Sequence, residues 1–221
     1  MIAAAPGSIA TCWAAWIGAL EAKNVAARML LRPGANDAAL VELEAVIGAR
    51  LPSEARELYA LADGQLDVFT IEAPAAGKIL TPIFGAFEFN SLERVAAEWS
   101  SWREIRNRST EEELDDFDLH VDVRAGDPVR KRYQHALWIP FATDGGGNSL
   151  ALDLDPAPGG TRGQIIVIGS DEDERRVLAG SLSAFLAESA RLLEVGRLTI
   201  GAPDDDDAPV AFFDIEPARL Q

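Results

Sequence analysis

Residues 138–168 read WIPFATDGGGNSLALDLDPAPGGTRGQIIVI, and this stretch decides the fold. Leu150, Leu152 and Leu154 alternate with smaller or acidic residues, which is the pattern of a strand with one buried face. The run QIIVIG at residues 164–169, which is apolar from Ile165 to Ile168, predicts a more central strand. The three consecutive glycines lack Cβ atoms and therefore favour a tight turn. We expect neighbouring strands of one sheet, joined by this turn and by a second Gly-rich connection.

Apolar residues at helical spacing predict helices on both sides of these strands. The predicted helices cover residues 8–31, 36–48, 52–64, 91–102 and 171–195, with short strands within 66–89. Helices that cluster early and late around a central run of strands predict an α+β fold in a single domain. In the last helix, Val177 and Leu178 are expected to face the core. The apolar run 210–215 is expected to add an edge strand or to dock on the body.

Asp and Glu outnumber Lys and Arg by 36 to 20, which gives a formal net charge of −16. Such a field repels nucleic-acid phosphates and anionic membranes, and it attracts basic protein partners. No stretch reaches the roughly 18 to 20 apolar residues needed to cross a bilayer. The single cysteine, Cys12, excludes an internal disulfide and suits a reducing compartment. We therefore expect a cytoplasmic protein that binds neither nucleic acid nor membrane.

The glycine run does not match a phosphate-binding loop, because no lysine follows it and it leads into a strand instead of a helix. Asp144, Asp153 and Asp155 raise the question of a calcium or magnesium site, but their spacing is wide for one ion and fits no EF-hand. We expect Asp153 and Asp155 to face solvent. Only His120 and His135 could serve as a base, and no Gly-x-Ser-x-Gly motif is present. The sequence thus predicts no metal, no cofactor and no enzyme, with a metal-dependent enzyme as a remote alternative.

The spacing of two tryptophans and a run of acidic residues indicate a part of the core and a part of the surface. Trp99 and Trp102 recur at helical spacing, so we expect both to anchor the core, with ligand stacking as the alternative. Six of the eight residues 111–118 are acidic, which is typical of a solvated loop. The predicted partner-binding surface combines this run with polar residues around the sheet, namely Asp144, Asn148, Asp153, Asp155, Glu111, Glu112, Glu113, Asp115, Asp116 and Asp118.

The order and spacing of these motifs resemble the SUKH superfamily, which contains the Smi/Knr regulators of cell-wall synthesis and many bacterial toxin-immunity proteins. The resemblance begins with LVELEAVIGARLPSEARELYALADGQ at residues 40–65 and is strongest in the stretch 138–164. The signature positions, which we expect to be structural, are Leu51, Pro52, Tyr59, Gly64, Trp138, Pro140, Gly145, Gly146, Gly147, Pro156, Gly160 and Gly163.

This resemblance implies a single α+β domain with a mixed, mostly antiparallel twisted sheet covered by helices. Residues 36–197 then form the domain, residues 1–35 an amphipathic helix packed on it, and residues 198–221 an acidic tail. The resemblance also implies binding without chemistry. The preferred hypothesis is an immunity protein that neutralises a basic bacterial toxin, such as a nuclease, encoded by the neighbouring gene. The alternative is a regulatory scaffold for an endogenous protein, for example in cell-wall synthesis.

Overall fold

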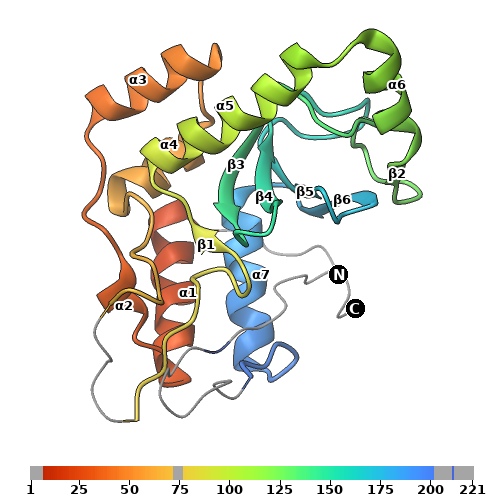
Figure 1. Ribbon diagram of the computed structural model, residues 1–221. Helices are drawn as coiled ribbons and strands as arrows, with labels where there is room; N and C mark the ends of the chain where they lie inside the picture. The colour runs from red at the N-terminus through yellow and green to blue at the C-terminus, as the bar shows by residue number, and fades with distance from the viewer. Residues whose placement is uncertain (1–6, 72–76, 202–210, 212–221) are drawn as a thin grey trace.

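The helices and strands in Figure 1 come from a computed structural model that describes residues 7–71, 77–201 and 211. The helices in this part of the chain are α1 (Ile9–Ala22), α2 (Ala27–Leu30), α3 (Asp37–Ile47), α4 (Ser53–Leu61), α5 (Leu92–Arg108), α6 (Glu111–Leu119) and α7 (Leu182–Glu194). The strands are β1 (Glu88–Phe89), β2 (Asp122–Val123), β3 (Trp138–Thr143), β4 (Asn148–Asp153), β5 (Gln164–Gly169) and β6 (Glu174–Ala179).

The strands form one mixed sheet in the order β1-β3-β4-β5-β6-β2. Neighbouring strands are antiparallel except β2 and β6, which are parallel. The turn between β3 and β4 contains Gly145 at φ 75° and Gly147 at φ 107°. Residues without Cβ adopt such positive φ angles most readily. The predictions of an α+β fold, of a mostly antiparallel sheet and of a turn at the glycines are therefore confirmed.

The main hydrophobic core lies between one face of this sheet and buried residues of the helices α1, α2, α3, α4, α5 and α7. α1 and α7 run side by side along one side of the sheet (Figure 1). Leu150 and Leu152 of β4 point into this core together with Ile165 and Val167 of β5. Trp16 of α1 is fully buried there, which matches the apolar stripe of the first predicted helix.

The opposite face of the sheet carries a second, smaller core made of Val129, Trp138, Ala151, Ile166 and Ile168. Val129 belongs to the segment that leads from β2 towards β3, and this segment covers the face. Both faces of β4 are consequently buried. The prediction of a single buried face is wrong, because the alternation of leucine with alanine and aspartate does not reveal a covering segment that comes from earlier in the chain.

Capping residues place several helix ends where the sequence predicts them. The Asn36 side chain accepts a hydrogen bond from the Ala39 N–H at 2.9 Å, and Gly48 ends α3 in the left-handed conformation. Ser91 caps α5 in the same way as Asn36 caps α3. α4 ends at Leu61, earlier than predicted, because the next residue is already extended.

The predicted first helix over 8–31 is divided in two. α1 ends at Ala22, and Asn24 has φ 66°, a left-handed conformation that interrupts a helix. Val25 is fully buried and forms an isolated bridge with Ile79. This tertiary contact outweighs the helical periodicity, and α2 resumes for only four residues.

The predicted last helix over 171–195 is also wrong in its first half. Residues 174–179 form β6, which pairs with β5, so Val177 and Leu178 lie in a strand. The helix α7 begins only after Ser181, whose side chain accepts from the Ala184 N–H at 3.2 Å. The backbone groups of β5 form hydrogen bonds with residues 174–179, and a helical sequence pattern does not reveal such a partner strand.

The acidic run 111–118 is a helix, α6, and not the predicted loop. Thr110 and Glu113 form a reciprocal capping box at its N-terminus. The three glutamates of the first turn lie at the positive end of the helix dipole, which stabilises them there. The sequence predicts a loop here because a dense acidic run is typical of solvated loops, although Thr110 and Glu113 also have the spacing of a capping box.

Two glycines and the tyrosine among the signature positions make close structural contacts. Gly64 has φ 78°, and a Cβ on it would lie 2.3 Å from the backbone nitrogen of Ser91. A Cβ on Gly163 would lie 2.9 Å from Cγ of Pro52. The Tyr59 hydroxyl donates to the carbonyl of Asn90 at 3.1 Å. These residues join α4 to the start of α5 and to the β4–β5 connection.

The ends of the chain bear on two predictions. Of the run 210–215, only Ala211 is described, and its N–H donates to the Leu80 carbonyl at 2.8 Å; the remaining residues of the predicted strand lie outside the described ranges. Within those ranges, no helix combines the length and the apolar composition that crossing a membrane requires.

Candidate functional site

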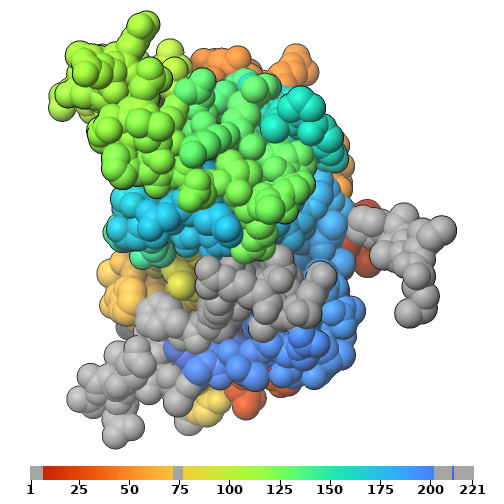
Figure 2. All heavy atoms as spheres, turned by 90° about the vertical axis from the view of Figure 1, so that its right-hand side faces the viewer, coloured from red at the N-terminus to blue at the C-terminus, as the bar shows by residue number. Residues whose placement is uncertain are grey.

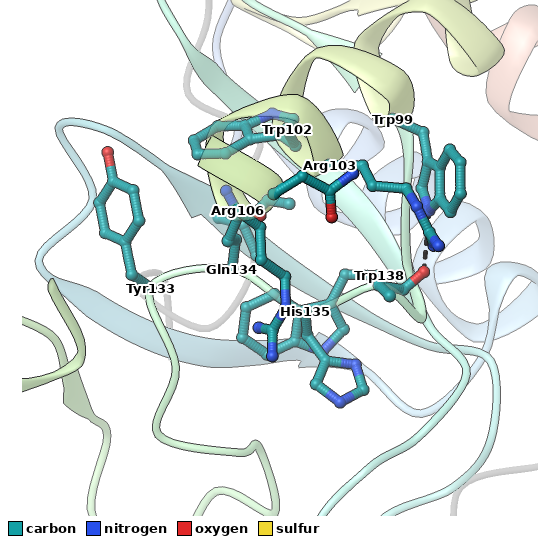
Figure 3. Close-up of a pocket in the computed structure, with 11 residues that line it drawn as sticks. Trp99, Trp102, Arg103, Arg106, Tyr133, Gln134, His135 and Trp138 are labelled. Carbon is teal, nitrogen blue, oxygen red and sulfur yellow. Dashed lines mark hydrogen bonds between the residues drawn. The ribbon is translucent and has the colours of Figure 1, made fainter. Parts of the chain in front are cut away.

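A pocket opens between the C-terminal half of α5 and the segment 133–138 that leads into β3 (Figure 3). The cavity measures about 120 Å³. The residues that matter below are Trp99, Trp102, Arg103 and Arg106 from α5, and Tyr133, Gln134, His135 and Trp138 from the segment. The four α5 residues follow the spacing i, i+3, i+4, i+7, which places them on one face of the helix. The pocket is also lined by Trp138 and Ile168 of the smaller core of the sheet.

Aromatic rings form much of the pocket wall. Trp102 meets Tyr133 edge to face, with ring centroids 5.8 Å apart. Trp99 is buried, and its indole N–H donates to the carbonyl of Ala136 at 2.8 Å, which ties α5 to the opposite wall. Trp102 is only half-buried, because the space beside it is the pocket. A core position is thus confirmed for Trp99 and wrong for Trp102.

Arg175 of β6 holds the pocket wall in place from behind. Its guanidinium donates to the carbonyl of Tyr133 at 2.7 Å and to that of Arg132 at 3.3 Å, and it lies over the Tyr133 ring at 5.9 Å from the centroid. Burial lowers the pKa of Arg175 to about 10, so the group remains charged at neutral pH. Asp118 of α6 accepts the Tyr133 N–H at 2.6 Å. An irregular segment is thereby fixed by charge-assisted hydrogen bonds.

Arg103 and Arg106 stand exposed on the rim of the pocket. The Arg103 guanidinium lies over the Trp99 ring, 5.0 Å from its centroid. Their neighbour Arg108 is paired with Glu104 at 2.5 Å. Among the residues that the structure describes, neither Arg103 nor Arg106 has a carboxylate within 4 Å. Both guanidinium groups are therefore available to an anionic ligand.

Gln134 lies in the pocket wall and is 7% exposed. Its amide nitrogen has no hydrogen-bond partner in the described part of the chain. The Trp138 indole N–H likewise has no partner of normal geometry there, although it lies close to the carboxylate of Asp153. Leaving a buried donor without an acceptor costs about 1–3 kcal/mol. An acceptor group that enters the pocket would recover that cost at Gln134 once the side-chain amide turns toward it.

His135 contributes a neutral ring to the same wall. Its Nδ1 accepts the Leu137 N–H at 3.2 Å, and its ring lies 5.7 Å from the Trp138 ring. Burial lowers the pKa of His135, while the nearby Asp155 carboxylate opposes this shift. Since a protonated Nδ1 could not accept from Leu137, the neutral form fits the observed contact.

The pocket and the whole sheet lie within the region that a family model covers. The model of the SMI1 / KNR4 family (SUKH-1) matches residues 34–188. This chain belongs to the SMI1/KNR4 family. The match includes α3 to β6 and the first part of α7, and the prediction of a SUKH protein is confirmed.

Several fungal members of the SMI1/KNR4 family are similar to this chain over most of its length. A glucan synthesis regulatory protein of Neurospora crassa is 28% identical over 212 residues, which cover 82% of this chain and 37% of that protein. The cell wall biosynthesis/cell cycle regulator smi1 of Schizosaccharomyces pombe is 32% identical over 179 residues, covering 79% and 33%. The cell wall assembly regulator SMI1 of Saccharomyces cerevisiae is 27% identical over 179 residues, covering 70% and 34%. The chain thus spans about a third of the length of these relatives.

These relatives overturn the hypothesis of a toxin-immunity protein. Their names describe regulators of cell-wall synthesis and assembly, so they favour the regulatory alternative within the same superfamily. The toxin partner follows from the resemblance to the superfamily, and the net charge of −16 supports only its basic character. That charge is compatible with many functions and does not distinguish an immunity protein from a regulator.

Two of the acids predicted for the partner surface lie next to the pocket, at the end of β4. Asp153 is fully buried and not solvent-facing as predicted, because it accepts from Nε2 of Gln164 at 2.9 Å and from the Asp155 N–H at 3.0 Å. Burial raises the pKa of Asp153. Asp155 is paired with Arg130 at 2.9 Å, and this hydrogen bond lowers the pKa of Asp155. In the described ranges, no three Asp, Glu, His or Cys side chains gather as a metal site.

Asp144 and Asn148 lie at the β3–β4 turn, at the opposite end of these strands from the pocket. Oδ1 of Asp144 accepts the N–H groups of Gly146 at 2.7 Å and of Asn148 at 3.0 Å. The Asn148 side chain in turn accepts the Asp171 N–H at 3.1 Å. Both residues shape the turn, and the structure does not bring them together with the pocket.

The acids of α6 divide into two groups. Glu113 completes the capping box, and Asp118 binds the pocket segment, so these two are structural. The remaining four are exposed, namely Glu111, Glu112, Asp115 and Asp116. Figure 2 shows α6 protruding at one corner of the molecule, in light green, with the segment 120–135 beside it. Two of these exposed acids, Glu111 and Asp115, therefore flank the side of the pocket that Arg106 borders.

Proposed function

We propose that this protein is a regulator of cell-wall synthesis that acts by binding a partner protein, without catalysing a reaction itself. The observation that carries the proposal is the similarity to fungal cell-wall regulators over as much as 82% of this chain. Because the chain covers only about a third of those proteins, their regulatory activity as a whole is extended to it only as part of this proposal.

The pocket between α5 and the segment 133–138 supports a binding function. It combines aromatic walls, two arginines without carboxylate partners among the described residues, and a buried amide donor without an acceptor. Aromatic residues and arginine are the types enriched at the energetic centres of protein interfaces. The exposed acids of α6 are the second part of the proposed contact surface and would face a part of the partner other than the one that enters the pocket.

The proposal includes a cytoplasmic location. Cys12 is the only cysteine of the chain and is buried on α1. Burial raises the pKa of its thiol, which keeps it in the unreactive protonated form. A single buried thiol is compatible with a reducing compartment.

Deletion of the gene in its source organism tests the regulatory function. We expect the rate at which labelled sugar enters the cell wall to change, and the full chain supplied from a plasmid to restore it. Purification of the tagged full chain under the same conditions should recover a specific protein partner. An unchanged rate of incorporation in the deletion strain, where the wild type expresses the protein, would refute the regulatory function.

A further inference from the structure

We propose that the pocket receives one aromatic side chain from an acidic segment of the partner protein. This inference rests on the proposed function, since it specifies the chemistry of the partner at the same site. Three features of the pocket support it, namely its aromatic walls, its free cationic rim and its buried amide donor.

The walls select an aromatic ring. Trp102 and Tyr133 already meet edge to face across the opening, and Trp138 lies below them (Figure 3). The cavity of about 120 Å³ suits a single ring rather than an extended apolar surface. An inserted ring would make further edge-to-face contacts with these walls and would remove the half-exposed indole of Trp102 from water.

The rim selects carboxylates. Arg103 and Arg106 project from α5 above the opening, one helical turn apart (Figure 3). Carboxylates placed beside a ring at the opening would lie within reach of both guanidinium groups, which bind such groups with two parallel hydrogen bonds. Gln134 is 7% exposed, and its buried amide nitrogen has no hydrogen-bond partner among the described residues, so it would bind a carboxylate or a backbone carbonyl once the side-chain amide turns toward the pocket.

The charges around the pocket favour a short acidic segment over other occupants. A basic segment would place its cations against Arg103 and Arg106. A nucleic acid or an anionic membrane would extend its charge beyond the pocket, over the exposed acids of α6. A short segment needs only a few carboxylates, all at the rim. Charges farther away are screened within about 8 Å at physiological salt, so the local arginines outweigh the net charge of the molecule.

Binding of a short synthetic peptide to the full chain tests this inference. The peptide contains one phenylalanine flanked on each side by two aspartates, and fluorescence anisotropy of an attached dye reports its Kd. The comparison peptides carry glycine for phenylalanine or lysine for aspartate. We expect the acidic aromatic peptide to bind at least tenfold more tightly than either comparison peptide.

Substitution of the two rim arginines tests whether the peptide binds at the pocket. The double variant Arg103→Gln/Arg106→Gln should weaken binding of the acidic peptide by about tenfold or more. The matched control Arg28→Gln/Arg197→Gln removes the same charge from exposed sites away from the pocket and should change Kd by less than about twofold. Trp102→Ala should weaken binding as well, with the fold confirmed by circular dichroism.

Several results would overturn the inference. These are no binding of the acidic peptide up to about 1 mM, tighter binding of the lysine peptide, equal binding of the glycine peptide, or an equal loss in the control variant. Phenylacetate that binds as tightly as the peptide would indicate a small carboxylate ligand instead of a protein. A peptide that fails to bind while gene deletion still alters wall synthesis refutes this inference alone. A peptide that binds while deletion has no effect refutes the regulatory function alone.

Discussion

Gly64 lies so close to Ser91 that a Cβ on the glycine would stand 2.3 Å from the serine nitrogen. The residues on either side of Gly64 form hydrogen bonds to the same part of the chain. Oδ1 of Asp63 accepts the Leu92 N–H at 2.8 Å, and Oε1 of Gln65 accepts two backbone N–H groups from the following segment. The Asp-Gly-Gln motif therefore fixes the start of α5, the helix that carries one wall of the pocket.

Gly64→Ala should lower the free energy of unfolding by about 2–4 kcal/mol, because it adds both a steric clash and an unfavourable φ. Gly48→Ala is the matched control. Gly48 has a similar φ of 71°, but open space surrounds its missing Cβ, so the loss should be about 1 kcal/mol. Urea unfolding of both variants measures the difference. Equal losses would show that the contact with Ser91 has no energetic importance.

The structure confirms helix ends that are predicted from neighbouring residues in the sequence. Asn36, Gly48 and Ser91 satisfy the backbone at helix ends, and their effect depends on neighbours only a few residues away. Two of the failures come from distant partners. Val25 pairs with Ile79, and Arg175 lies in a strand that pairs with β5, and neither partner can be seen in the local pattern.

Only one wall of the pocket could be predicted from the sequence. The spacing of Trp99, Trp102, Arg103 and Arg106 predicts a shared helix face, and it could have indicated a mixed aromatic and cationic surface. The opposite wall could not have been predicted in this way. Its position depends on Arg175, some forty residues further along the chain, which binds the backbone of Tyr133 at 2.7 Å.

Gln134→Leu should leave the free energy of unfolding unchanged or raise it by up to about 1 kcal/mol, because the amide nitrogen that it removes has no partner among the described residues. The same variant should bind the acidic aromatic peptide more weakly. Gln65→Leu is the matched comparison. It deprives the N–H groups of Ile83 and Phe89 of their acceptor and should cost about 2–4 kcal/mol. A strongly destabilised Gln134→Leu would mean that Gln134 has a structural role.

Asp153→Asn should lower the free energy of unfolding by about 1–3 kcal/mol, because its new amide group would face the amide donor of Gln164. Gln164 cannot simply turn over. Its nitrogen also donates to the Pro128 carbonyl at 3.0 Å, and its oxygen accepts the Thr161 N–H at 3.2 Å. Asp116→Asn, at an exposed site on α6, should change stability by less than about 0.5 kcal/mol. A similar effect of both changes in urea unfolding would contradict the buried role of Asp153.

His135→Asn should flatten the pH dependence of stability below about pH 6.5. The pKa of His135 in the folded state is lowered by burial below its ordinary value of 6.5, so the fold favours the neutral ring. The stability that His135 contributes is therefore complete above about pH 6.5 and is lost as pH falls through the folded-state pKa. The asparagine oxygen can accept the Leu137 N–H without titrating. Urea unfolding at about pH 7.5 and pH 5 measures the change, and equal losses in the wild type and the variant would exclude this role for His135.

Neutralising three exposed acids of α6, as Glu112→Gln/Asp115→Asn/Asp116→Asn, should raise the association rate of the acidic aromatic peptide by about twofold to tenfold at low salt. The effect should fade as salt rises, since it acts through exposed surface charges of α6, of which Asp115 lies beside Arg106. Stopped-flow fluorescence gives the rates. The triple variant Glu42→Gln/Glu57→Gln/Glu194→Gln removes the same charge from exposed sites on other helices and should have a smaller effect. Equal acceleration in both variants would mean that the net charge of −16, and not the position of α6, governs the approach of the ligand.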